Sequence, residues 1–171
     1  AENVAQRFKI SRQDQDTFAY ESHQKAARAQ ADGRFKEQIL PIKVVDRGFE
    51  GGKAVAREKI FDKDECIRPD TSLEALSKLR PVFRAGGTVT AGNSCPLNDG
   101  AAAAVVMSRE KAKELKLKPM AVFRSMGVGG VDPEIMGIGP VVAIPKAVKY
   151  AGISLDSVDL IELNEAFASQ S

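Results

Sequence analysis

The chain has 171 residues, of which 43% are hydrophobic and 28% are charged. This balance excludes disordered and fibrous proteins and allows one domain or two incomplete ones. The 25 basic and 23 acidic residues leave a formal net charge of +2. No basic cluster indicates a nucleic-acid partner, and no apolar run reaches the roughly 18–20 residues of a membrane span, so neither partner is expected.

Residues 11–33 are predicted to form a helix. Ser11 is a favourable N-cap, Asp14 follows three residues later as in a capping box, and Gly33 is a plausible C-terminal cap. Small residues recur at helical spacing and predict one packing stripe: Phe18, Ser22, Ala26 and Ala29.

The next segment is typical of a β-hairpin. Ile39 to Val45 is rich in β-branched residues, a glycine-rich turn covers residues 48–52, and a second strand is expected over residues 54–61. Three leucines at three-residue spacing then predict a short amphipathic helix over residues 72–80, which Pro81 ends.

Residues 86–100 contain four glycines and several small polar residues. Such a loop lets backbone approach a ligand closely, but it contains neither a GxGxxG motif nor a P-loop lysine. From the residues alone, a ligand contact and a tight structural turn are equally consistent with this loop.

After this loop the pattern changes to alternating strands and helices, which indicates α/β architecture. Strands are expected over residues 101–107, 120–128 and 158–163, and helices over residues 108–115 and 140–151, the second closed by Gly152. We therefore expect a helix-plus-hairpin region up to about residue 90, followed by partial α/β layers.

Asn164 and Glu165 follow the last predicted strand, and ligands gather at the carboxyl ends of such strands. An asparagine amide there can stabilise an oxyanion directly or through a water molecule, and a glutamate can act as a base or orient a neighbour. The alternative is a helix cap with a carboxylate that complements the helix dipole, which the residues alone favour.

The two cysteines, Cys66 and Cys95, lack CxxC spacing, which argues against a zinc site or a disulfide framework and indicates a reducing compartment. Cys95 could be a nucleophile, but packing is the favoured interpretation because no histidine is placed to activate it. Cys66 is interpreted as structural. The only histidine, His23, lies on a charged helix and is interpreted as a solvated surface residue. No metal site is expected.

Eight stretches, in this order and spacing, resemble the thiolase family, and within it the degradative 3-ketoacyl-CoA thiolases and acetyl-CoA acetyltransferases. They are residues 1–5, 11–16, 67–69, 79–83, 88–93, 98–102, 132–140 and 164–168. The resemblance covers essentially the whole chain. It implies an incomplete thiolase-like α/β fold, in which two similar halves carry a large loop domain inserted in the first half.

On this template, residues 1–92 are similar to part of the loop domain, residues 93–119 to the end of the N-terminal half, and residues 120–171 to the start of the C-terminal half. The chain begins without a signal-peptide pattern and stops without a helix-ending signal. We therefore expect both ends to continue in a longer protein, and the isolated chain to be marginally stable or oligomeric.

The resemblance implies acyl transfer between 3-ketoacyl-CoA and coenzyme A, with both as substrates and no permanently bound cofactor. In this family a cysteine nucleophile precedes the loop domain, and a histidine and a second cysteine follow later, so these 171 residues alone are expected to be inactive. The family also implies a homodimer or homotetramer. The expected compartment is the cytoplasm in a bacterium, or the mitochondrion or peroxisome in a eukaryote.

Site residues carry over one by one. Asn164 matches an asparagine that holds a water molecule in an oxyanion hole, and Arg68 matches an arginine at the nucleotide end of coenzyme A, where a guanidinium can stack on adenine and pair with phosphate. Cys95 stands where many members have a pantetheine-contacting serine, and Ser94 is a possible substitute. Other matched contacts with coenzyme A or the acyl chain are Phe83, Ala91, Met136, Ala166 and Phe167.

Two alternatives remain open. The chain could be a catalytically inactive module that binds coenzyme A or supports oligomer assembly. A related condensing enzyme, such as a sterol-carrier-type thiolase or a 3-ketoacyl synthase, is disfavoured by residues 164–167, at which those enzymes usually differ.

Overall fold

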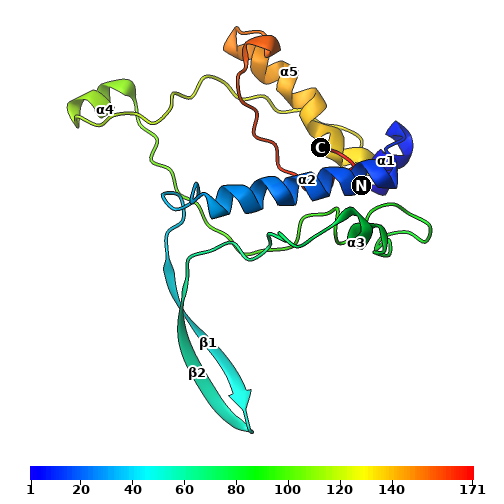
Figure 1. The fold of residues 1–171 in the computed structure, drawn as a ribbon. Helices are drawn as coiled ribbons and strands as arrows, with labels where there is room; N and C mark the ends of the chain where they lie inside the picture. The colour runs from blue at the N-terminus through cyan, green and yellow to red at the C-terminus, as the bar shows by residue number, and fades with distance from the viewer.

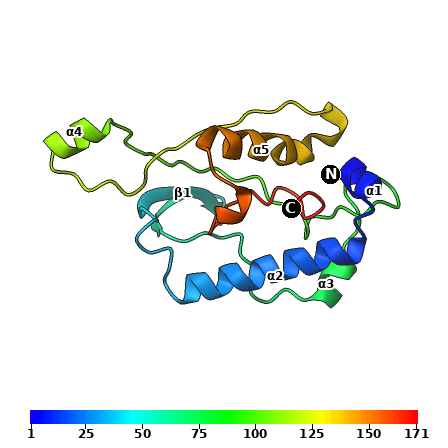
Figure 2. The same ribbon diagram turned by 90° about the horizontal axis from the view of Figure 1, so that it is seen from above.

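A computed structural model describes residues 1–171 and shows one long helix, with most of the shorter helices toward its N-terminal end and one short helix set apart (Figure 1). The N-terminal part contains α1 (Glu2–Phe8), α2 (Arg12–Ala31), the strands β1 (Ile42–Glu50) and β2 (Lys53–Phe61), and α3 (Leu73–Ser77). The C-terminal part contains α4 (Arg109–Glu114), α5 (Gly139–Ala151) and two 3-10 helices, η1 (Pro133–Ile138) and η2 (Leu155–Ser157). Figure 2 shows the C-terminal segment passing between α2 and α5.

The long helix α2 begins as predicted. The Asp14 amide donates to Ser11 Oγ over 3.0 Å, and the Ser11 amide donates to Asp14 Oδ2 over 3.1 Å, which completes the capping box. Gly33 follows the helix at φ 71°, a conformation that favours glycine. The predicted helix and both of its ends are therefore confirmed.

The hairpin is confirmed, but its first strand is displaced from the predicted residues 39–45. The strands pair antiparallel in one continuous register from Ile42 opposite Phe61 to Glu50 opposite Lys53. Only Gly51 and Gly52 form the turn, both at positive φ, as a type I′ turn requires. Residues 48–50 pair with the second strand instead of joining the turn, so the hairpin is longer than predicted and projects from the end of α2 (Figure 1).

The predicted helix over residues 72–80 is shorter in the structure, where α3 covers Leu73–Ser77. The Arg12 guanidinium donates to the carbonyl oxygens of Leu76 over 2.6 Å and of Leu79 over 3.0 Å. These carbonyls at the helix end are satisfied by a side chain of α2 rather than by further helical turns. The same bonds hold α3 against the start of α2.

The core is small and lies where α1, the first half of α2 and the loop around residue 90 meet. Only 12 of the 171 residues are buried. The apolar core residues here are Val4, Ala5, Ala19 and Val89, and buried polar side chains lie beside them: Gln15, Asp16, Thr90, Asn93 and Ser169. These polar side chains are hydrogen-bonded, except that Gln15 Oε1 has no partner, and their bonds favour one specific arrangement of this part of the chain.

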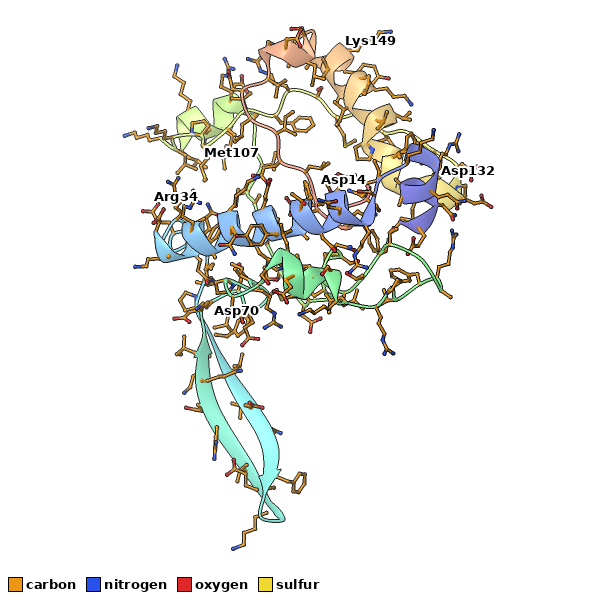
Figure 3. The ribbon with its side chains drawn as sticks, turned by 45° about the vertical axis from the view of Figure 1, so that its right-hand side comes forward. Asp14, Arg34, Asp70, Met107, Asp132 and Lys149 are labelled. Atoms are coloured by element: carbon orange, nitrogen blue, oxygen red, sulfur yellow. The ribbon has the colours of Figure 1, made fainter.

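The predicted buried strands over residues 101–107, 120–128 and 158–163 are wrong. These segments carry no strand pairing, and residues 101–107 are exposed throughout. A strand must pair its N–H and C=O groups with a neighbouring strand, and the one sheet of the structure consists of β1 and β2. Figure 3 shows Met107 beside α4, well away from the part of α2 that carries Asp14.

The helices of the second region are confirmed. Ser108 caps α4 through a bond from the Lys111 amide, and α5 ends at Gly152 in the left-handed conformation with φ 67°. No helix of the structure combines the length and hydropathy that crossing a bilayer requires. The region therefore keeps the predicted helices, while the connecting segments remain extended and unpaired.

Candidate functional site

The glycine-rich loop and the Asn164 motif meet through backbone pairing. Ser94 and Phe167 form an isolated antiparallel β-bridge. The Cys95 amide donates to the Ala166 carbonyl over 2.9 Å, and the Ala168 amide donates to the Asn93 carbonyl over 3.0 Å. We call residues 93–95 with 166–168 the bridge segment. It joins the glycine-rich loop to the segment that carries Asn164.

Asn93 fixes the bridge segment to α2. The residue is 3% exposed. Its side chain donates to Asp16 Oδ1 over 3.0 Å and to the Thr88 carbonyl over 3.1 Å, and accepts from the Thr90 amide over 2.8 Å. Asp16 is in turn held by Arg12 Nε at 2.7 Å. A buried network in which every member is bonded provides a rigid support for the site.

Glu2 at the start of α1 holds the same loop from the other side. Its carboxylate accepts hydrogen bonds from the amides of Thr88 and Val89, both at 2.9 Å. Burial alone would raise the pKa of Glu2, but the Val89 and Thr88 hydrogen bonds and the positive charge of Arg84 together lower it below 4.5. Glu2 is therefore ionised at neutral pH and orders the loop that leads into the bridge segment.

A hollow of about 610 Å³ lies between α2 and the bridge segment. Four residues predicted for the site line this first hollow: Ser94, Cys95, Asn164 and Ala166. The Asn164 side chain is exposed and makes no hydrogen bond within the chain. Its amide is therefore free to bind a ligand or a water molecule.

A second hollow of about 460 Å³ lies on the other side of the bridge segment, between α1 and η1. Its lining includes Phe83, Met136, Ala166 and Phe167 among the predicted residues. The rings of Phe83 and Phe167 meet edge to face, with centroids 6.0 Å apart and planes at 71°. Ala166 lines both hollows, which therefore adjoin at the bridge segment.

Two predicted residues line neither hollow. Ala91 is exposed, on the turn between Thr90 and Gly92. Arg68 is also exposed, but its backbone amide donates to His23 Nδ1 over 3.2 Å, and His23 does line the first hollow. Arg68 therefore lies at the rim of the first hollow.

His23 differs from the predicted solvated surface residue, because the segment around Arg68 packs over this face of α2 and leaves the imidazole half-buried. Burial and then the nearby Arg68 charge lower the pKa of His23 below 6.5, while Glu165 opposes this. Helical spacing could have predicted that His23 faces the site, because it shares a helix face with Ala19 and Ala26, which also line the hollow.

Glu165 is held from the same helix, because the Ser22 hydroxyl donates a hydrogen bond to its carboxylate. Because Asn164 directly precedes Glu165, this bond also restricts where Asn164 lies relative to α2. Cys66 is half-buried and contacts the Asn98 amide at 2.8 Å. No group of three or more histidine, cysteine or acidic side chains could hold a metal ion.

Together these elements form two adjoining cavities, and each mixes polar with apolar groups. The first offers Asn164 and His23 beside Phe18, and the second offers Phe83 and Phe167 beside Arg84. The two cavities lie on either side of the bridge segment and share Ala166 as a lining residue.

Models of two families match the chain. The family described as "Thiolase, N-terminal domain" matches residues 1–110, and the family described as "Thiolase, C-terminal domain" matches residues 117–171.

Curated relatives match almost the whole chain. A "3-ketoacyl-CoA thiolase" of Bacillus subtilis (strain 168) is 54% identical over 171 residues, which are 99% of this chain and 44% of that protein. A "3-ketoacyl-CoA thiolase 2, peroxisomal" of Arabidopsis thaliana is 52% identical over 172 residues, with 99% of this chain and 36% of that protein covered. The chain thus spans less than half the length of these relatives.

Solved structures show the same fold. The Bacillus anthracis acetyl-CoA acetyltransferase aligns with a TM-score of 0.91 and 46% identity, over 99% of this chain and 41% of that one. The human mitochondrial 3-ketoacyl-CoA thiolase aligns with a TM-score of 0.88 and 44% identity, over 99% of this chain and 40% of that one. The expected α/β thiolase fold, present in part, is confirmed.

Proposed function

The chain belongs to the thiolase family, and from that premise we propose that the protein carrying it is an acyltransferase that cleaves or forms 3-ketoacyl-CoA. Coenzyme A is the acyl acceptor in the cleavage direction. The names of the relatives, 3-ketoacyl-CoA thiolase and acetyl-CoA acetyltransferase, support this substrate class. Coenzyme A and acyl-CoA are substrates, and no permanently bound cofactor is required.

The observation that carries the proposal is the meeting of the two hollows at Ala166. An acyl-CoA is an elongated ligand with an apolar acyl end, a polar pantetheine arm and an anionic nucleotide. In the proposed pose the thioester lies beside the bridge segment, where the exposed Asn164 amide can hold a water molecule against a developing oxyanion.

The remaining predicted residues take roles according to their place. Phe83, Phe167 and Met136 line the second hollow and would surround the acyl chain and the adjoining part of pantetheine. Ser94 and Cys95 line the first hollow and would contact pantetheine, although a thiol is a weaker hydrogen-bond partner than a hydroxyl.

The nucleotide end of coenzyme A would lie toward the rim of the first hollow. There the exposed guanidinium of Arg68 can pair with phosphate or stack on adenine. Ala91 remains a proposed contact of coenzyme A on the exposed turn beside the bridge segment.

We assign residues 1–92 to the loop domain, residues 93–119 to the end of the N-terminal half and residues 120–171 to the start of the C-terminal half. In this proposal, the unpaired segments 101–107, 120–128 and 158–163 become strands when further residues of a longer protein pair with them. Exposed apolar side chains on these segments, such as Val106 and Leu160, support that arrangement.

The same longer protein would supply the nucleophilic cysteine, the histidine and the second cysteine, since neither Cys66 nor Cys95 takes a catalytic position. Residues 1–171 alone would then be inactive. We further propose a homodimer or homotetramer, located in the cytoplasm of a bacterium or in a mitochondrion or peroxisome of a eukaryote; the named relatives include bacterial and peroxisomal proteins.

The test is the intact mass of the protein isolated from its source, followed by thiolysis of a 3-ketoacyl-CoA. We expect a mass well above 18.4 kDa and consumption of the 3-ketoacyl-CoA that depends on coenzyme A. A mass of 18.4 kDa with coenzyme A binding but no turnover would instead support the alternative, an inactive coenzyme A-binding or assembly module. Absence of both turnover and binding would contradict both functions.

A further inference from the structure

The segment that carries Arg68 is tied to α2 by two adjacent helix residues. The Arg68 amide donates to His23 Nδ1 over 3.2 Å, and Gln24 Nε2 donates to the Pro69 carbonyl over 3.3 Å. The two bonds hold the backbone on either side of the peptide group that joins Arg68 to Pro69. The Arg68 side chain itself is exposed and makes no hydrogen bond or ion pair within the chain, so only its backbone fixes where the guanidinium stands.

From this geometry we infer that His23 is a positioning residue of the coenzyme A site: as an unprotonated acceptor, it holds the backbone of Arg68 at the rim of the first hollow. The inference rests on the proposed function, and it assigns the only histidine of the chain a role that acts through Arg68. An arginine whose backbone is fixed loses less conformational freedom when it binds an anion, so binding is tighter.

The bond requires one protonation state of the imidazole. Nδ1 accepts the Arg68 amide only in the neutral tautomer that carries its proton on Nε2. Protonation turns Nδ1 into a donor, breaks the bond and places a second positive charge beside Arg68. Positioning by His23 is therefore lost at acid pH.

The charges around His23 determine the pH at which positioning is lost. Arg68 faces it from the 62–72 segment and favours the neutral imidazole, and Glu165 faces it from the C-terminal segment and favours the charged one. The other titratable groups of the same hollow are Glu162, Cys66 and Cys95. Burial and Arg68 prevail and lower the pKa of His23 below 6.5, so the acceptor form persists at neutral pH.

The test compares His23→Ala, which removes the acceptor, with His23→Asn, whose Oδ1 offers a non-titrating acceptor near the position of Nδ1. Gln13→Ala, an exposed change on the same helix, is the control. In the intact protein, the Kd of coenzyme A and of pantetheine, which lacks the nucleotide, is measured for each variant by calorimetry.

At about pH 8, where the imidazole is neutral, we expect His23→Ala to raise the Kd of coenzyme A about three- to tenfold. His23→Asn and Gln13→Ala should stay within about twofold of the wild type. Pantetheine affinity should be unchanged in all variants, because it does not reach Arg68. If His23 had only a structural role, His23→Ala would weaken the binding of coenzyme A and pantetheine alike, and this result would overturn the inference.

As the pH falls from about 8 to about 5, the affinity of the wild type for coenzyme A should decrease relative to that of His23→Asn. The titration of the coenzyme A phosphates affects both proteins equally and cancels in this ratio. A wild type that binds more tightly than His23→Asn at acid pH would mean that the imidazolium acts as a direct anion contact, and would overturn the inference.

Failure of the proposed function is distinguishable from failure of this inference. A wild-type protein that binds no coenzyme A overturns both. A wild type that binds coenzyme A, with His23→Ala binding equally well, overturns the role of His23 alone.

Discussion

Asn93 and Asp16 form a buried hydrogen bond of 3.0 Å that joins the bridge segment to the long helix α2. Each residue is less than 5% exposed. The bond links a residue in the middle of a glycine-rich loop to a charged residue in the first turns of α2, where Arg12 balances the carboxylate. The position of the candidate site therefore depends on the N-terminal half of α2.

Replacing Asn93 with alanine should cost about 2–4 kcal/mol of unfolding free energy. The substitution leaves Asp16, Thr88 and Thr90 each without one buried partner, although the ion pair of Asp16 with Arg12 remains. Chemical denaturation of the intact protein measures the change. Asn98→Ala, at an exposed position, should cost less than about 0.5 kcal/mol, and an equal loss in both variants would contradict the role of the network.

Asn164→Ala should lower kcat for thiolysis about 100- to 1,000-fold and leave KM for coenzyme A within about threefold. The proposed oxyanion contact exists in the transition state, so its loss affects the chemical step more than binding. Steady-state kinetics of the intact protein measure both constants. Gln38→Ala, which removes an exposed amide without a side-chain hydrogen bond, is the control. A rise in KM with unchanged kcat would assign Asn164 to ground-state binding instead.

Gly92→Ala should destabilise the loop that leads into the bridge segment by about 1–3 kcal/mol. A Cβ atom at Gly92 would lie 2.5 Å from Leu76 Cδ2 and 2.5 Å from Leu79 Cδ1, so both leucine side chains would have to shift, and Leu76 is buried. Thermal unfolding measures the effect. Gly100→Ala meets no atom within 4 Å and should leave the melting temperature almost unchanged, whereas equal shifts would show that the α3 contact is not the cause.

Local patterns predicted the helices and the hairpin, because their signals lie within a few residues. The capping box at Ser11 and the closing Gly152 determine helix ends by hydrogen bonds that the neighbouring residues supply. The β1–β2 pair likewise depends on one short turn. For these elements, periodicity and turn residues are sufficient.

The strands expected over residues 101–107, 120–128 and 158–163 were wrong for a non-local reason. Their apolar residues are typical of buried strands, but burial and pairing depend on neighbours that sequence periodicity does not specify. His23 and Glu2 were missed as parts of the site for a related reason, since each acts through residues more than 40 positions away. Asn164 and the glycine-rich loop were identified, but not their pairing through Ser94 and Phe167.

The contribution of Glu2 to the stability of the folded state should depend on pH in a predictable way. Although burial alone would raise it, the hydrogen bonds from Val89 and Thr88 lower the folded-state pKa of Glu2 below 4.5. An acid with a lowered pKa stabilises the folded state fully above its unfolded value, and this contribution is lost as the pH falls through the folded-state pKa. The contribution of Glu2 should therefore be complete at neutral pH and vanish in strong acid.

Glu2→Gln isolates this contribution, because the amide keeps the shape and one acceptor oxygen but carries no charge. We expect the variant to be less stable than the wild type by about 1 kcal/mol at neutral pH, since hydrogen bonds to a charged group are stronger but this one is only partly buried. The difference should shrink as the pH falls below 4.5, the ordinary pKa of a glutamate. Denaturation of the intact protein across this pH range measures it, with the exposed Glu37→Gln as control. A difference that stays constant down to strong acid would mean that the glutamine disturbs packing, and that the charge of Glu2 does not hold the amides of Thr88 and Val89.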